Sequence, residues 1–119
     1  MKKQARVIVK DGERGCCPEV SSPKLTQARA EEYSEWFKAL ADPIRIRILN
    51  LLPNNESAVC VCDIVKHFPV GQPTISHHLK ILRDRGFVQV ERRCTFMYYR
   101  VNRKGLAEFP RAAHLILNV

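Results

Sequence analysis

The spacing of apolar residues predicts two helices in the first half of the chain. Between Thr26 and Ala41 apolar residues recur every three or four positions, as expected for a helix with Thr26 as its N-cap. Asp42 and Pro43 then mark a second helix start, because aspartate caps exposed N–H groups and proline fits a first turn. Ile46 and Leu49 lie off the main apolar stripe of this second helix, so we expect it to be buried on more than one side.

Two further helical segments follow a turn-rich break at residues 53–57. The first is predicted to be short and to end near His67 or Phe68. The second is predicted to run from Gln72 to Arg85, with a glycine before it and another after it. Its apolar stripe includes His78, which we expect to pack rather than to face outward.

The rest of the chain has the pattern of a β-hairpin followed by one more helix. β-Branched and aromatic residues alternate in part over 87–92 and 95–101. A last helical stretch reaches Leu117, and Pro110 is expected to kink it or to begin a second short segment. Two helices joined by a tight turn and followed by a basic hairpin predict a winged helix-turn-helix, a mainly α fold with a β-hairpin (α+β).

The charge balance and the outward face of the fourth predicted helix favour double-stranded DNA as a partner. Twenty Lys and Arg against twelve Asp and Glu give a net charge of +8, which in a 119-residue chain suggests a polyanion. A recognition helix places its first turns against base edges and phosphates in the major groove. The expected DNA contacts are Gln72, Thr74, Ser76, His77 and Lys80 on this helix, and Arg92 and Arg93 on the hairpin.

The N-terminal segment reads as an arm. Residues 1–23 show no sustained periodicity, and their apolar run at 7–9 is too short for a secretory signal. No run is long enough to span a membrane, so we expect a cytoplasmic protein with free thiols. Its five cysteines, an odd number, are then better explained as ligands, redox groups or small buried side chains than as a disulfide framework.

Three blocks of sequence resemble the ArsR/SmtB family of metal-responsive repressors, the arsenical-resistance repressors in particular. They are FKALADPIR at 37–45, CVCDI at 60–64 and QPTISHHLK at 72–80, within a similarity that covers roughly residues 33–101. The resemblance implies a homodimer whose first and last helices form the interface. It also implies repression in the apo state and release of the operator when metal binds. Residues 24–119 would form the winged helix-turn-helix domain for DNA binding and dimerisation.

The cysteines are the candidate ligands for such an ion, because soft thiolates select soft ions. Cys60 and Cys62 match the family's Cys-Val-Cys-Asp box, and Cys16 and Cys17 form an adjacent pair in the arm that is too close for an ordinary disulfide. In an ideal helix, Cys60 and Cys62 would point about 200° apart, so both could bind one ion only if the helix start is distorted. Cys94, near the hairpin tip, is expected to be a bystander.

Three thiolates suit As(III) or Sb(III), so release by one of these metalloids is the favoured hypothesis. Cd(II), Pb(II) or Zn(II) are alternative inducers, and a further alternative is a redox sensor in which Cys16 or Cys17 forms a disulfide with Cys60 or Cys62. A zinc site between the last helices is not expected, because His114 is its only candidate ligand. An enzyme is not expected either, because no catalytic arrangement accompanies Cys16 in the sequence.

Overall fold

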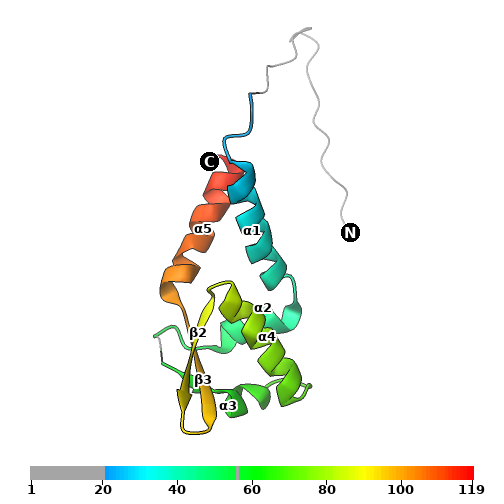
Figure 1. The fold of residues 1–119 in the computed structure, drawn as a ribbon, viewed down its shortest axis with the longest axis vertical. Helices are drawn as coiled ribbons and strands as arrows, with labels where there is room; N and C mark the ends of the chain where they lie inside the picture. Colours follow the sequence, from blue (N-terminus) through cyan, green and yellow to red (C-terminus); the bar gives the residue numbers. More distant parts are fainter. Residues whose placement is uncertain (1–20, 56) are drawn as a thin grey trace.

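The computed structural model describes residues 21–55 and 57–119. The elements follow the order expected for a winged helix-turn-helix (Figure 1). In this part of the chain they are α1 (Gln27–Leu40), α2 (Pro43–Leu51), β1 (Val59–Cys60), α3 (Val61–Val65), α4 (Gln72–Asp84), β2 (Val88–Arg93), β3 (Phe96–Val101) and α5 (Arg103–Leu117). None of these helices has the length and apolar character needed to cross a membrane.

The first two helices begin where the sequence predicts. The Thr26 hydroxyl accepts a hydrogen bond from the Arg29 backbone N–H at 3.2 Å, which satisfies one of the unpaired donors at the start of α1. The Asp42 carboxylate accepts from the backbone N–H groups of Ile44 at 2.8 Å and Arg45 at 3.3 Å. Both predicted N-caps are therefore confirmed.

α3 is shorter than its apolar pattern suggests. The helix ends at Val65, not near His67 or Phe68, and the chain continues through turns in which His67 and Phe68 donate to the carbonyls of Ile64 and Val65, both at 3.1 Å. Phe68 is nevertheless buried in the core. The helical spacing of apolar residues therefore continues beyond the end of α3, because a turn can also direct an apolar side chain into the core.

α4 and the hairpin agree closely with the sequence predictions. α4 ends at Asp84, and Gly86 follows with a φ of +82°, a left-handed conformation that glycine adopts without strain. The hairpin strands β2 and β3 are antiparallel, with Val88 opposite Val101. Their link contains Cys94, whose φ of +56° is unusual for a residue other than glycine.

The hairpin belongs to a three-stranded sheet with the order β1-β3-β2. β1 pairs antiparallel with β3, so that Val59 faces Tyr99 and Cys60 faces Tyr98. The sequence analysis missed β1, because two residues are too few to show an alternating pattern. This short strand connects the segment of Cys60 directly to the hairpin.

α5 is one helix from Arg103 to Leu117 with Pro110 inside it, so Pro110 does not begin a second segment, and the alternative of a kink there stays a prediction. Pro110 is exposed, where water can bond the carbonyl that the missing proline N–H leaves unpaired. The start of α5 lies close against the turn after α4: the Asn102 side chain donates to the Gly86 carbonyl at 2.8 Å. A Cβ atom on Gly105 would clash with that same carbonyl, so the close approach requires glycine.

The hydrophobic core lies among α2, α3, α4 and the sheet, with α1 contributing Ala39. Ile48, Ile64, Ile75, Leu79 and Leu82 are fully buried in it. Leu49 is partly buried against this core, whereas Ile46 is 53% exposed. The expectation that α2 is buried on more than one side therefore holds in part at Leu49 and is wrong at Ile46. Figure 1 shows α1 and α5 rising from this core and converging near the C-terminus.

Candidate DNA-binding surface and thiol site

α4 presents a polar face along its first turns. Ile75, Leu79 and Leu82 are buried, which fixes the rotation of the helix on the core. The predicted contact residues consequently lie on the other side: Ser76 is half-buried, and Gln72, Thr74, His77 and Lys80 are exposed. The Lys80 ammonium lies 3.3 Å from the Asp84 carboxylate, an exposed pair that is weak in water and can exchange for a phosphate.

His78 is not simply a packing residue. It is half-buried, as its place beside the apolar stripe suggests, but its Nδ1 lies 3.1 Å from Nη1 of Arg45 on α2. No local pattern of residues points to this partner, because the two residues are 33 positions apart. Arg45 is thus a residue that the sequence analysis missed.

The two predicted arginines of the hairpin differ in their surroundings. Arg93 hydrogen-bonds both carboxylate oxygens of Glu91, at 3.2 and 3.3 Å, and its guanidinium lies 4.4 Å from the centre of the Tyr98 ring. The hydrogen bond from Arg93 is the main reason why the pKa of Glu91 lies below its ordinary value, and Arg100 adds to the effect. Arg92 is exposed, so its charge faces solvent at the end of β2.

The sulfur atoms of Cys60 and Cys62 come together. Cys60 is the N-cap of α3 and has an extended backbone (φ −64°, ψ 138°), so it lies outside the helix that contains Cys62. The ideal-helix geometry that would point the two thiols about 200° apart therefore does not apply. Their Cα atoms are 5.2 Å apart and the structure joins their sulfur atoms as a disulfide. Cys60 is buried, whereas Cys62 is exposed.

The other predicted thiols fall into two groups. Cys16 and Cys17 lie outside the described residues. Cys94 is a free, exposed cysteine at the far end of the hairpin, which places it on the order of 10 Å along β3 from the register position of Cys60. Within residues 21–55 and 57–119, no group of three or more His, Cys, Asp or Glu side chains is arranged to hold a metal ion.

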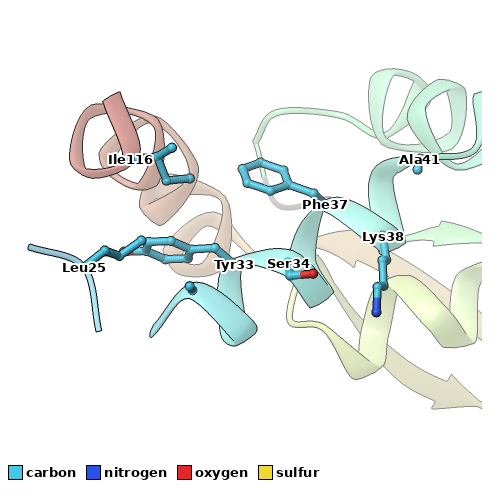
Figure 2. Close-up of a pocket in the computed structure, with 8 residues that line it drawn as sticks. Leu25, Tyr33, Ser34, Phe37, Lys38, Ala41 and Ile116 are labelled. Carbon is cyan, nitrogen blue, oxygen red and sulfur yellow. The ribbon is translucent and has the colours of Figure 1, made fainter. Parts of the chain in front are cut away.

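An apolar surface lies away from the polar face of α4, on α1, α2 and α5. A hollow of about 540 Å³ is lined by Leu25, Tyr33, Phe37 and Ile116 among others, and Figure 2 shows Ile116 of α5 lying across from Phe37 of α1. A second hollow of about 490 Å³ lies between Phe37, Ile46 and Phe109. The rings of Phe37 and Phe109 are 5.7 Å apart, edge to face. We call these exposed side chains and hollows the helical apolar surface.

Comparisons with known proteins agree on the family. The family described as bacterial regulatory protein, arsR family, matches residues 42–90. A helix-turn-helix-type transcriptional regulator of Methanocaldococcus jannaschii is 46% identical over 69 residues, which are 58% of this chain and 76% of that protein. An arsenical resistance operon repressor of Staphylococcus xylosus is 40% identical over 76 residues, 64% of this chain and 71% of that one.

A solved structure extends the agreement to the whole fold. The homodimeric winged helix-turn-helix domain of a possible ArsR-family regulator from Mycobacterium bovis superimposes with a TM-score of 0.61 at 26% identity, over 84% of this chain and 91% of that one. The order of elements, the polar recognition helix and the relatives thus agree, and the predicted fold is confirmed. The chain is a member of the ArsR family of DNA-binding transcriptional repressors, which are not enzymes.

Proposed function

We propose that the chain acts in the cytoplasm as a homodimer that binds operator DNA with α4 in the major groove. The observation that carries this proposal is the exposed polar face of α4, which is held outward by a fully buried opposite face. The proposed contacts on this helix are Gln72, Thr74, Ser76, His77 and Lys80. Gln72 and Thr74 lie in the first turn, where backbone N–H groups can also meet phosphate.

The wing, formed by β2, β3 and their link, supplies the second DNA contact. We assign the phosphate contact first to Arg92, because its charge is exposed at the end of β2. Arg93 can join it only by leaving Glu91 and the Tyr98 ring, which makes it the weaker of the two contacts.

The helical apolar surface supports dimerisation. Its exposed side chains on α1, α2 and α5 include Phe37, Ile46, Phe109, Leu115, Ile116 and Leu117. A single chain leaves them in contact with water, whereas a second copy packed along α1 and α5 would bury them. The hollow in Figure 2 is open to solvent and can receive side chains of that copy.

The inducer that we propose is As(III) or Sb(III), bound by Cys60, Cys62 and a thiol of the arm, Cys16 or Cys17. Two converging sulfur ligands suit a soft ion, and three thiolates complete the preferred shell of a trivalent metalloid. Because the described residues contain no third ligand beside Cys60 and Cys62, residues 1–23 are proposed to act as an arm that delivers one. The arsenical resistance repressor among the relatives supports this choice. Cd(II), Pb(II) or Zn(II) with a fourth ligand is the alternative.

A second candidate is a thiol redox sensor, which the pairing of Cys60 with Cys62 specifically favours. Oxidation would convert the two thiols to a disulfide, with two electrons and two protons passing to a small-molecule disulfide that is reduced to two thiols. This pairing differs from the sequence-based alternative, in which a cysteine of the arm joins Cys60 or Cys62. Oxidation would then remove both ligands from the metal site.

A fluorescence-anisotropy titration tests these proposals. The reduced protein is bound to a labelled duplex, selected from a random-sequence library, at one fixed salt concentration, because DNA affinity depends steeply on salt. We expect arsenite to release the duplex in stoichiometric amounts; release by Cd(II) alone would favour the alternative inducers. In a separate titration, the small-molecule disulfide is added as the oxidant. Release of the duplex by this oxidant, reversed by a reductant without a chelator, would favour the redox sensor.

Two single substitutions form a matched pair for this titration. Cys62→Ser should abolish release by arsenite and preserve apo binding, because Cys62 is exposed and contributes little to the core. Cys94→Ser should leave both unchanged, since Cys94 lies at the far end of the wing. Equal loss of release in both variants would contradict the proposed thiol site.

A further inference from the structure

One arginine side chain connects three helices. Arg45 belongs to the first turn of α2, and its Nε donates to the Ala39 carbonyl of α1 at 2.6 Å. Its Nη2 lies 3.4 Å from the Lys38 carbonyl, also on α1, and its Nη1 lies 3.1 Å from Nδ1 of His78 on α4. The guanidinium thus contacts the end of α1 and the recognition helix at the same time.

The chemistry of this contact suits arginine and no other side chain. The last carbonyls of a helix have no intrahelical partner, so the end of α1 presents acceptors to the Arg45 fork. A guanidinium holds its N–H groups in one rigid plane, whereas a lysine ammonium is a point charge on a flexible stem. A lysine at this position would keep the charge but could not satisfy α1 and α4 together.

The contact also fixes the state of the His78 ring. Arginine has only donors, so Nδ1 of His78 must be the acceptor. The ring is therefore neutral, with its proton on Nε2. Protonating Nδ1 would replace the hydrogen bond with two facing donors and two positive charges.

We infer that Arg45 and His78 are positioning residues for operator recognition, which set the orientation of α4 relative to α1. This inference rests on the proposed function, in which α4 reads DNA and α1 belongs to the dimer surface. A dimer must hold its two recognition helices about one DNA turn apart, roughly 34–36 Å. A rigid connection from α1 to α4 within each chain keeps that spacing constant.

Several charged groups surround the contact between Arg45 and His78. From α2, Arg45 and the Asp42 carboxylate face the ring; burial raises the pKa of Asp42, but hydrogen bonds from the backbone N–H groups of Arg45 and Ile44 bring it below its ordinary value. On α4 the His77 ring lies 6.1 Å away, centre to centre. At this end of α1, the charges of Lys38 and Glu35 pair with each other at 3.1 Å.

The chain offers a matched control between the same two helices. Arg85, just after α4, lies 2.9 Å from Glu35 of α1, but both side chains are about two-fifths exposed. An exposed ion pair contributes little, because water screens it. Arg85→Gln therefore cuts an α1–α4 contact without disturbing the connection through Arg45.

The experiment compares the affinity for the selected duplex with the affinity for an unrelated duplex of equal length. We expect Arg45→Lys and His78→Leu each to lower the ratio of the two affinities about tenfold, as for one lost hydrogen bond to a charged group. His78→Asn keeps an acceptor near the position of Nδ1 and should stay within about twofold of the wild type. Arg85→Gln should leave the ratio unchanged.

Several outcomes would overturn the inference while leaving DNA binding intact. They are an unchanged ratio in Arg45→Lys, or equal ratios in His78→Leu and His78→Asn. If Arg45→Lys unfolded and lost both affinities together, the comparison of His78→Leu with His78→Asn would still test the inference. Wild-type protein with no preference for the selected duplex would instead refute the proposed function, and the inference with it.

Discussion

The hydrophobic core and the helical apolar surface differ in the exposure of their apolar side chains. On α2 alone, Ile48 is completely buried in the core and Ile46, two positions away, is 53% exposed. The core buries its apolar residues within one chain, whereas the exposed side chains of the helical apolar surface remain in contact with water. Under the proposed function, the DNA-binding part is complete in a single copy, and α1 and α5 form the part that requires a second copy.

The largest effect is expected from truncating the buried member of this pair on α2. Ile48→Ala should lower the free energy of unfolding by about 2–5 kcal/mol, because it leaves a cavity in a packed core. Ile46→Ala should cost less than about 1 kcal/mol, since its side chain already contacts water. Urea unfolding of both variants measures the difference, and equal losses would contradict the division of the two regions.

A charge on the helical apolar surface should separate the dimer without unfolding the chain. Ile116→Asp would place a carboxylate in the hollow of Figure 2, and we expect the dimer dissociation constant to rise at least about a hundredfold. Sedimentation equilibrium measures it. Phe96→Asp is the control, because Phe96 is 51% exposed but lies on the wing. Dissociation by Phe96→Asp alone would place the interface on the wing instead.

The stability of the turn between α1 and α2 should depend on pH through Asp42, the N-cap of α2. Asp42→Ala removes the cap of α2 and should cost about 1 kcal/mol of unfolding free energy at neutral pH. Because the folded-state pKa of Asp42 lies below its unfolded value, the cap stabilises the fold above about pH 4 and is lost as the pH falls through the folded pKa. The difference between the wild type and Asp42→Ala should therefore shrink in acid. A difference that grew in acid would contradict this assignment; thermal unfolding from pH 7 to pH 2.5 distinguishes the two.

The smallest effect is expected at the wing tip. Cys94→Gly should raise the free energy of unfolding by roughly 0.5 kcal/mol, because relief of the left-handed backbone slightly exceeds the added entropy of the unfolded chain. Thermal unfolding against Cys94→Ser, which keeps the strain, measures the gain. Loss of stability in Cys94→Gly would show that the thiol makes a contact of its own.

Local signals in the sequence predicted most of the fold and only part of the candidate site. Thr26, Asp42, Gly71 and Gly86 mark helix ends by chemistry that acts over a few residues, and the structure agrees with each of them. The pairing of Arg45 with His78 joins distant positions, and no periodicity encodes such a contact.

The thiol box shows the same limit at short range. The expected opposition of Cys60 and Cys62 assumed one helix, but the helix begins one residue later, after an extended Cys60. Helix boundaries are the least certain part of any pattern-based prediction, and here a single residue reverses the geometry. The exposure of Ile46 was missed for another reason: an apolar period shows that a side chain needs burial, not whether the same chain provides it.

Cys60 serves three parts of the structure at once, and this limits how the proposed ion preference can evolve in this chain. It pairs with Tyr98 as a strand residue, caps α3 with its sulfur 3.3 Å from the Cys62 backbone nitrogen, and lies buried in the core. Substitution there would alter the sheet and the helix start together with the ligand. Cys62, in contrast, is exposed and has no comparable role in the sheet or the core. If the proposed thiol site binds the inducer, changes of inducer should accumulate at Cys62 and among the ligands from the arm, while position 60 stays a cysteine.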